Sequence, residues 1–478
     1  MINYFNVLLF SILTLQWTRS IVCFFPLHNK LSSPNYKTFI KDQEIKKTIK
    51  YTLSPSKQNQ INKLDGFFGI IGPNTNFSKN TNLLDLFIGD GIIQGVFFKG
   101  GKIIFVKQFI KTEKILHEEK HGKMPDNIFI KLVFYFLHGL KMMPNVFGVA
   151  NTALLKINTN IYALYEKDAP YKLHIDFDNT NIQTIKKVNI EPLHHFSAHS
   201  KIQKQQAQQA QQAQQGQPTQ KEEKIIETID YNIFANTLEY YRLTQDFVLL
   251  NKRNIQLKYM PLIHDFLTTP NKLIIVDSPL TIDQSKHSLM LHQTQKTIIR
   301  ILNKETDTIE SYETDETFFI FHYAGLKEDA NNIYIYASMY NNIDFKEFQF
   351  SGKYRKIIVN KLTKKVTIER DSIAETFNLD FPVTFNDKTV FTKKDGIAIF
   401  KDLTLVKDLT FHNKYSCGES AVTYIDNIPY LLALTFDKVD NKKSFLILVN
   451  LNNYEITEIS LDEQLHVGFH SIFVRSKN

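Results

Sequence analysis

Short apolar runs rich in β-branched and aromatic residues recur along the chain from about residue 65 onward. Asn, Asp, Gly and Lys separate these runs, which is the pattern of short strands joined by turns. The clearest runs cover residues 101–107, 160–165, 271–277, 332–338, 356–360 and 444–450. This pattern predicts an all-β sandwich, barrel or propeller, and the length of the chain favours a propeller. The sequence shows no clear internal repeat of the WD type.

Two segments interrupt the strand pattern. Residues 127–143 are strongly apolar and have the length of a helix. They predict either a helix packed on the β body or an amphipathic segment that dips into a membrane face. Residues 204–224 consist mainly of Gln and Ala with charged ends, a composition that cannot bury a core. We therefore expect residues 204–224 to form a disordered insertion.

The N-terminal segment differs in composition from the rest of the chain. Residues 1–23 contain an apolar run too short to span a bilayer, which predicts a signal peptide although a basic start is missing. Residues 24–63 are rich in Lys, Asn, Ser and Thr and poor in acids, as transit peptides are. This combination resembles the two-part leaders of secondary plastids, and the alternative is a secreted protein with a basic tail. The folded body is then expected over residues 64–478.

The positive charge of the chain is concentrated in this leader. The formal net charge is +8, but residues 24–63 alone hold eight lysines against two acids. The remaining sequence is therefore nearly neutral, and it lacks the basic stripe that a nucleic-acid-binding surface needs. The 38 Phe and 21 Tyr instead indicate a large apolar interior or an apolar ligand cavity.

The two cysteines, Cys23 and Cys417, limit the covalent and metal chemistry available. Cys23 lies at the end of the predicted signal peptide, so the body has no second cysteine with which to form a disulfide framework. A metal site of the CxxC type is excluded for the same reason.

Four histidines stand out because each lies inside an apolar, strand-like stretch. A buried imidazole costs free energy unless its nitrogens find partners. One such residue is usually a satisfied core histidine, whereas four predict convergence on a single buried centre, most simply a metal. The four are His199 in Phe-Ser-Ala-His, His264 in Pro-Leu-Ile-His-Asp-Phe, His322 in Phe-Ile-Phe-His and His470 in Gly-Phe-His.

Ordered motifs along the body resemble those of a known family. Residues 66–74 form a glycine-rich start that ends in Gly-Pro-Asn, and residues 89–91 read Gly-Asp-Gly. Residues 109–113 read Phe-Ile-Lys-Thr-Glu, residues 164–170 contain Leu-Tyr-Glu, and the four histidine segments follow in order. Over roughly residues 65–475 the chain resembles the carotenoid cleavage oxygenases, which include plant plastid dioxygenases and the animal retinoid isomerase.

The resemblance implies a seven-bladed β-propeller with a helical dome over an iron-containing active site. A single Fe(II) would be held by His199, His264, His322 and His470, with no catalytic side chain beyond the iron centre. Three acids would orient histidine rings from outside, namely Glu166, Asp380 and Glu419. The family usually has Glu where Asp380 stands. Because Asp is one methylene shorter, its bond would need a backbone adjustment or a water.

The resemblance also implies a function. It indicates an oxygenase that uses O2 to cleave a C=C bond of a carotenoid or apocarotenoid, an apolar polyene, into aldehyde or ketone products. One alternative is an iron-dependent enzyme that isomerises or hydrolyses a polyene substrate. The other is a propeller without catalytic activity that binds apolar ligands. Membrane contact through residues 127–143 would fit a substrate that dissolves in lipid.

Overall fold

The computed structural model describes residues 43–75, 87–124, 127–191, 193, 195–205, 223–233, 235–283, 288–344 and 349–476. The chain divides into two compact units. The larger holds residues 45–110 and 149–478, and the smaller holds residues 1–44 and 111–148. Within the described residues, no helix combines the length and the apolar character that crossing a membrane requires.

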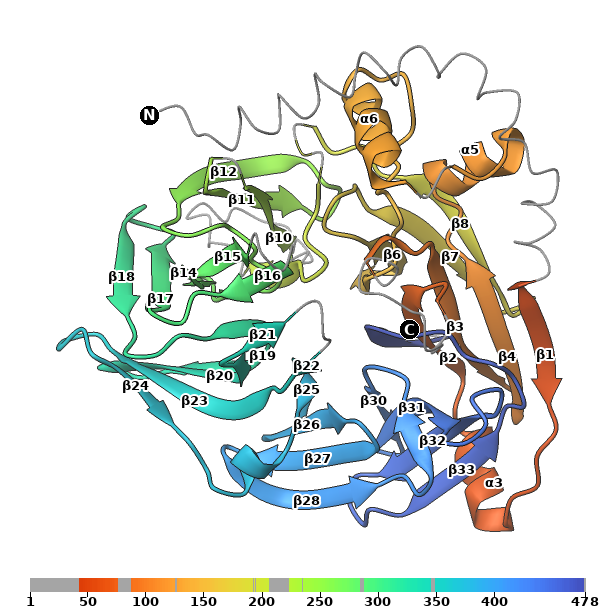
Figure 1. Ribbon diagram of the computed structural model, residues 1–478. Helices are drawn as coiled ribbons and strands as arrows, with labels where there is room; N and C mark the ends of the chain where they lie inside the picture. Colours follow the sequence, from red (N-terminus) through yellow and green to blue (C-terminus); the bar gives the residue numbers. More distant parts are fainter. Residues whose placement is uncertain are drawn as a thin grey trace, which may run out of the picture. The chain divides into compact units, whose positions relative to one another are not determined.

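The larger unit is a seven-bladed β-propeller, which confirms the predicted fold class (Figure 1). Its seven blades are antiparallel sheets of four or five strands, and chain order follows the ring. Blade one contains β1 (Ile45–Ile49), β2 (Gly66–Pro73), β3 (Gly91–Lys99), β4 (Lys102–Phe109) and β34 (Ser471–Arg475). Blade two contains β5 (Ala153–Ile157), β6 (Asn160–Leu164), β7 (Tyr171–Asp176) and β8 (Asn181–Lys187). Blade three contains β9 (Lys201–Gln205), β10 (Glu223–Asn232), β11 (Thr237–Thr244) and β12 (Leu249–Gln256).

The remaining four blades repeat this arrangement. Blade four contains β13 (Leu267–Thr268), β14 (Lys272–Asp277), β17 (Ile298–Asn303) and β18 (Ile309–Glu313). Blade five contains β19 (Phe319–Glu328), β20 (Asn332–Tyr340), β23 (Lys353–Asn360) and β24 (Val366–Glu369). Blade six contains β25 (Asp380–Phe385), β26 (Lys388–Lys393), β27 (Gly396–Lys401) and β28 (Thr404–Thr410), preceded by the short 3-10 helix η1 (Ala374–Thr376). Blade seven contains β29 (Lys414–Ser416), β30 (Ala421–Ile425), β31 (Ile428–Asp437), β32 (Ser444–Asn450) and β33 (Ile456–Ser460).

The hydrophobic core is divided among the interfaces between neighbouring blades. Seven apolar clusters each join two adjacent blades. Because side chains alternate across a strand, neighbouring residues serve different interfaces. Phe97 on β3 packs toward blade two, whereas Phe98 packs toward blade seven. Burial on both faces explains why many strands are continuous apolar runs.

The two ends of the chain meet in blade one and close the ring. The C-terminal strand β34 pairs with β2, with Gly66 opposite Arg475. A Cβ atom at Gly66 would lie 2.3 Å from the carbonyl oxygen of Val474, so the close approach of the closing strand requires glycine there. The glycine-rich motif recognised in the sequence therefore has a structural role in closure.

The folded unit begins earlier than the sequence predicts. Part of the expected basic leader, residues 45–63, forms β1 and the helix α3 (Pro55–Asn62). Strand β1 pairs with β4, and Ile49 and Ile61 are buried in the cluster between blades one and seven. The predicted boundary at residue 64 was therefore wrong, because composition alone does not reveal a strand that pairs with a segment further along the chain.

The Gln-rich insertion is a connection within one blade. Its predicted ends belong to strands, since Gln205 closes β9, Glu223 opens β10, and the two residues pair across the hairpin. The expected disordered segment is thus shorter at both ends than residues 204–224, and residues 206–222 lie outside the described residues.

An eighth sheet is built from two hairpins inserted in blades four and five. It contains β15 (Leu280–Asp283), β16 (Ser288–Leu291), β21 (Ile343–Asp344) and β22 (Gln349–Phe350). Its apolar residues Leu280, Leu291 and Ile343 pack with Phe319 and Tyr340 of blade five. This sheet therefore covers the start of β19, the strand that carries one of the four predicted histidines.

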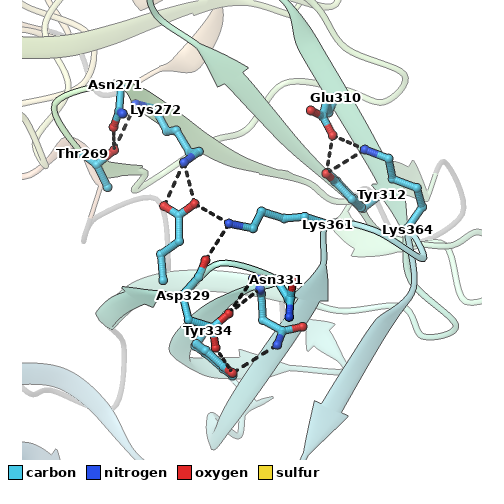
Figure 2. A network of polar contacts seen from close by, with 12 residues as sticks. Thr269, Asn271, Lys272, Glu310, Tyr312, Asp329, Asn331, Tyr334, Lys361 and Lys364 are labelled. Atoms are coloured by element: carbon cyan, nitrogen blue, oxygen red, sulfur yellow. Dashed lines mark hydrogen bonds and ion pairs between the residues drawn. The ribbon is translucent and has the colours of Figure 1, made fainter.

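Ion pairs also join blades four and five at the opposite end of β19. Lys272 from β14 and Lys361, which follows β23, both bind the carboxylate of Glu328 (Figure 2). The distances are 2.6 and 2.9 Å from Lys272 Nζ and 2.9 Å from Lys361 Nζ. Such partly exposed pairs contribute about 0–1 kcal/mol each, so the apolar cluster remains the main connection between these blades.

Where the structure describes it, the smaller unit forms the helices α5 (Glu113–His121) and α6 (Ile128–Gly139). The hydroxyl of Thr112 caps α5 by accepting a hydrogen bond from the Ile115 amide. The helix predicted within residues 127–143 is confirmed and is shorter than the apolar run. The resemblance implies that helices form a dome over the active site, and this placement stays a prediction.

Candidate metal centre

Each of the seven blades supplies one polar residue to a common centre. The four histidines come from blades one, three, four and five. His199, His264 and His470 lie in the loops that lead into β9, β13 and β34, two, three and one residues before these strands, and His322 lies within β19. The three acids come from the other blades. Glu166 follows β6 of blade two, Asp380 opens β25 of blade six, and Glu419 lies between β29 and β30 of blade seven.

Local backbone irregularity places His322 in the centre. The pairing of β19 with β20 shifts register between Ile320 and Tyr323, and the bulge re-aims the intervening side chains. Strand β25 shifts register between Asp380 and Val383, and Phe381 has a φ of +51°. Both irregularities occur beside a side chain of the centre, His322 in β19 and Asp380 in β25.

The four imidazoles converge closely. One ring nitrogen of each histidine lies within 4.8 Å of the corresponding nitrogen of every other. The Nε2 atoms of His199 and His264 are 3.0 Å apart, and those of His322 and His470 are 3.2 Å apart. Metal–imidazole bonds of about 2.1 Å at right angles put two nitrogens about 3 Å apart. These spacings therefore fit a single metal ion. Among the described residues, this is the one group of three or more His, Cys, Asp or Glu side chains that fits a metal.

Three of the rings have a carboxylate behind them. Glu166 Oε1 lies 2.5 Å from His264 Nδ1, Asp380 Oδ1 lies 2.8 Å from His322 Nδ1, and Glu419 Oε1 lies 3.3 Å from His470 Nδ1. An ionised carboxylate accepts hydrogen bonds and donates none, so each of these contacts places the ring proton on Nδ1.

Each carboxylate uses its second oxygen to bind the protein. Glu166 Oε2 accepts a hydrogen bond from the Tyr231 hydroxyl at 3.0 Å, and Asp380 Oδ2 accepts one from the Tyr340 hydroxyl at 2.7 Å. Glu419 Oε2 accepts one from the backbone amide of Ser471 at 2.8 Å. These partners fix the carboxylates and, through them, the planes of the three imidazoles.

The tautomers give a physical test of whether a metal fits. With Nδ1 protonated in both His322 and His470, both Nε2 atoms carry a bare lone pair and point at each other across 3.2 Å. Two neutral acceptors cannot form a hydrogen bond at that distance, so they repel unless a cation, either a proton or a metal ion, lies between them. Burial opposes a proton on His322, but Asp380 outweighs it and raises the pKa of this ring. The donor set therefore fits a divalent metal held by four neutral imidazoles.

The electrostatics of the site keep Asp380 and Glu166 ionised. Burial alone would raise the pKa of Asp380, but His322 and the hydrogen bonds to this carboxylate hold its pKa below the ordinary value. The same opposition of burial and His264 leaves the pKa of Glu166 below its ordinary value. Burial, and then the three neighbouring histidines, lower the pKa of His199 well below 6.5, so this ring is neutral and ready to bind a metal.

Asp380 reaches its histidine directly, despite being one methylene shorter than the family's usual Glu. The 2.8 Å contact leaves no room for a bridging water. The register shift after Asp380 and the left-handed conformation of Phe381 supply the adjustment. Of the two routes expected from the sequence, the structure therefore uses the backbone.

Aromatic side chains surround the histidines. Phe381 stacks on His322 with ring centroids 5.0 Å apart, and Phe321 meets His264 edge to face at 5.7 Å. Phe321 also contacts Tyr340 and Phe350, which places the eighth sheet beside the centre. Dry, apolar walls strengthen electrostatic interactions within a site.

Sequence reasoning missed Tyr231 and Tyr340. Neither has a local signature, because a tyrosine in a strand is ordinary and its hydroxyl partner is far along the chain. Asp265, which directly follows His264, accepts hydrogen bonds from the amides of Phe266 and Tyr323. His195 pairs with Asp230, away from the four-histidine centre.

Comparison with known proteins agrees with this architecture. Residues 62–394 match the family model described as retinal pigment epithelial membrane protein. The chain is similar to carotenoid 9,10(9',10')-cleavage dioxygenase 1 of Arabidopsis thaliana, with 25% identity over 62% of this chain. That alignment spans about half, 55%, of the plant protein. The protein of the same name from Pisum sativum is 27% identical, over 86% of this chain and 84% of its own length.

A solved structure has the same fold. It is a variant of the Synechocystis apocarotenoid oxygenase, with a TM-score of 0.70 and 18% sequence identity. The superposition covers 91% of this chain and 96% of the other. At this identity the similarity establishes the propeller architecture.

Proposed function

Because this chain belongs to the retinal pigment epithelial membrane protein family, we propose that it is a non-haem Fe(II) oxygenase acting on carotenoids or apocarotenoids. It cleaves one C=C bond with O2 and gives aldehyde or ketone products. The names of the plant relatives, which are cleavage dioxygenases, support this proposal. The observation that carries it is the convergence of one ring nitrogen from each of four histidines, all within 4.8 Å of one another.

The proposed metal is iron, held by His199, His264, His322 and His470. Imidazole also suits zinc, copper and nickel, so the donor set alone does not select among them. Bound Fe(II) would supply the redox chemistry by which O2 and one C=C bond become two C=O bonds. Elemental analysis of protein purified without added metal tests this assignment, and zinc as the main metal would contradict it.

The residues of the chain hold and shield the centre. Glu166, Asp380 and Glu419 keep three imidazoles in one tautomer and orientation, which outer carboxylates do at many metal sites. Phe321 and Phe381 present apolar surfaces next to the histidines, as a long apolar polyene requires. The side chains of this protein position the metal and exclude water, and the metal supplies the reactivity.

The direct test is aerobic incubation of the protein starting at residue 43 with Fe(II) and a panel of carotenoids and apocarotenoids. Products are separated by chromatography and identified by mass spectrometry. We expect carbonyl products whose masses sum to the substrate plus two oxygen atoms, and none from His264→Ala. Intact polyenes with every substrate, from folded protein loaded with iron, would contradict the cleavage proposal.

Two alternatives give different results in the same assay. An isomerase or hydrolase keeps its activity without O2 and yields products that contain no added oxygen from O2. A binding protein without catalytic activity retains the polyene unchanged and needs no metal to do so. Repeating the incubation under nitrogen and with metal-free protein separates both alternatives from oxygenative cleavage.

Peripheral contact with a membrane through residues 127–143 forms part of the proposal. Leu132, Phe136, Leu140 and Met142 in this segment are exposed apolar side chains. Replacing Phe136 and Leu140 with Ser should reduce co-sedimentation with vesicles of neutral phospholipid. Leu362→Ser, at another exposed apolar position in the propeller, is the matched control. Unchanged co-sedimentation of the double variant would contradict this contact.

The proposed location is a secondary plastid, reached through a signal peptide at residues 1–23 and a transit segment that begins at residue 24 and precedes β1. The basic, acid-poor composition supports this proposal. Residues 1–42 fused to a fluorescent protein should direct it to the plastid. Release of the fusion into the medium would favour the alternative of secretion.

A further inference from the structure

His199 differs from the other three histidines of the centre. Within the described residues it has no ion pair with a carboxylate, whereas His264, His322 and His470 each have one. Its ring is buried, and the loop before β9 carries it. The position of His199 therefore has to be fixed by the segment on which it lies, and the nearest charged side chain on that segment is Lys201.

Lys201, whose side chain is 30% exposed, forms an ion pair with the buried residue that follows the second histidine. Its Nζ atom lies 2.6 Å from Oδ1 of Asp265, whose side chain is only 4% exposed. The same ammonium lies 5.5 Å from the centre of the Phe266 ring. The pair joins blade three to blade four, two residues from His199 and one residue from His264.

Asp265 also binds the strand that carries the third histidine. Its Oδ2 atom accepts a hydrogen bond from the amide of Tyr323 at 3.3 Å, and Tyr323 follows His322 directly. Its Oδ1 atom accepts a second one from the amide of Phe266 at 2.7 Å. One carboxylate therefore contacts three segments, each of which carries a histidine of the centre.

We propose that Asp265 and Lys201 are positioning residues that set the spacing of His199, His264 and His322 around the metal. This inference rests on the proposed metal centre and extends it to residues that do not touch the histidine rings. Asp265 fixes the chain beside His264 and His322, and Lys201 connects the segment of His199, which Ser197 and Ser200 already bind to Thr228 of blade three, to blade four.

The burial of the Asp265 carboxylate explains why the pair is suited to this role. A buried charge that loses its partner is strongly unfavourable, so the two side chains stay together in one geometry. Backbone amides in a strand have little freedom to move, and the hydrogen bond to Tyr323 therefore transfers that geometry to β19. An exposed ion pair would allow both chains to shift relative to each other.

If Asp265 had only a structural role, removing another buried charge between the same two blades should weaken metal binding equally. The propeller contains a second buried ion pair between blades three and four, Glu227 with Lys304, at 2.6 Å. Glu227 is 1% exposed, which matches the 4% of Asp265, whereas Lys304 is more buried than Lys201, at 4% against 30%. Glu227→Gln is therefore a matched control that removes a buried charge between the same two blades. Glu328→Gln removes the ion pairs at the far end of β19 (Figure 2).

The test measures metal binding in the protein starting at residue 43. We compare Asp265→Asn with the two controls, using the dissociation constant for Co(II) from chelator competition and the visible ligand-field spectrum of bound Co(II). Loss of an outer partner typically weakens metal binding about 10–100-fold. We expect this loss and an altered spectrum for Asp265→Asn. The controls should keep the wild-type spectrum and remain within about threefold in affinity. Chemical unfolding of the metal-free proteins shows whether stability changes in parallel.

Further variants keep the inference falsifiable if the single substitution folds poorly. Asp265→Asn combined with Lys201→Met removes both charges and leaves no buried ion unpaired, and it should still give the altered spectrum. Asp265→Glu restores the charge and should recover part of the affinity. If Asp265→Asn binds Co(II) as the wild type does, or loses affinity only as much as Glu227→Gln, the positioning role is overturned.

The same experiment separates this inference from the proposed function. If His322→Ala binds Co(II) as tightly as the wild type, the metal centre itself is wrong, whatever Asp265→Asn does. If His322→Ala loses binding and Asp265→Asn does not, the metal centre stands and the positioning role fails.

Discussion

His322 and His470 point their Nε2 atoms at each other across 3.2 Å, while each ring faces a carboxylate with its Nδ1 atom. Asp380 lies behind the first ring and Glu419 behind the second. The two rings come from blades five and one and are 148 residues apart in the sequence. This relationship leaves the Nε2 atoms of both rings facing one common point, where a metal ion can bind them, and the first prediction follows from it.

Removing one of these rings should abolish tight metal binding. We expect His470→Ala to hold far less than one equivalent of metal and to lose more than about 100-fold in activity, because a ligand matters more than an outer partner. Metal analysis and product formation measure the two effects. His174→Ala, at an exposed histidine in β7, is the control and should behave as the wild type. Equal metal content in the two variants would refute the assignment of His470 as a metal ligand.

The short carboxylate behind His322 should be sensitive to its charge. Asp380→Asn keeps the shape of the side chain but removes the negative charge that holds the Nδ1 proton. We expect metal affinity to fall about 10–100-fold, as measured by chelator competition. Asp380→Glu keeps the charge and should lose less. A larger loss for the Glu variant than for the Asn variant would mean that fit, not charge, controls this position.

A buried histidine outside the metal centre should make the protein sensitive to acid. Burial, with Lys107 nearby, lowers the pKa of His466 to about 4. Because the folded-state pKa lies below the unfolded value of about 6.5, the unfolded chain takes up a proton first as the pH falls. This residue therefore contributes stability that is present above about pH 6.5 and is lost toward pH 4.

The size of that effect can be measured by difference. Between about pH 7.5 and pH 5, His466 should cost the metal-free protein about 2 kcal/mol of unfolding free energy. Urea unfolding of the wild type and of His466→Gln at both pH values isolates this contribution. The backbone of His466 keeps its hydrogen bonds to Gln94 in the variant. The same pH dependence in both proteins would contradict the prediction.

Truncation should reveal the true start of the propeller. A protein that starts at residue 64 lacks β1 and α3, and with them the buried side chains of Ile49 and Ile61. Burying each isoleucine is worth about 1.5–3 kcal/mol, so their combined loss is a large part of the stability of an ordinary domain. We expect the protein from residue 43 to unfold cooperatively and the one from residue 64 to aggregate. Equal stability of the two would show that the strap formed by residues 45–63 is dispensable.

The single cysteine of the propeller should report on unfolding. Cys417 is buried and free, and burial raises the pKa of its thiol to about 12. A thiol that is both buried and protonated reacts slowly with alkylating reagents. In the protein from residue 43, labelling at pH 8 should therefore follow denaturant unfolding. Rapid labelling of the native protein would contradict the burial of Cys417.

The sequence by itself determined the strand-rich architecture and the four histidines. Strand periodicity and turn residues are local properties, so short windows reveal them. The histidines could be recognised because each is polar within an apolar run, and the order of the surrounding motifs carried the resemblance. The three outer acids followed from that resemblance and not from any local pattern.

The tertiary structure decided which acid faces which histidine and what holds the acids in place. Glu166 and Tyr231 are 65 residues apart, and Asp380 and Tyr340 are 40 residues apart, so their contacts exist only after the blades have assembled. The start of the propeller at β1 and the link from Lys201 to Asp265 are decided in the same way. A strand at a sheet edge and an ion pair between blades depend on partners that are distant in sequence, and no local composition specifies those partners.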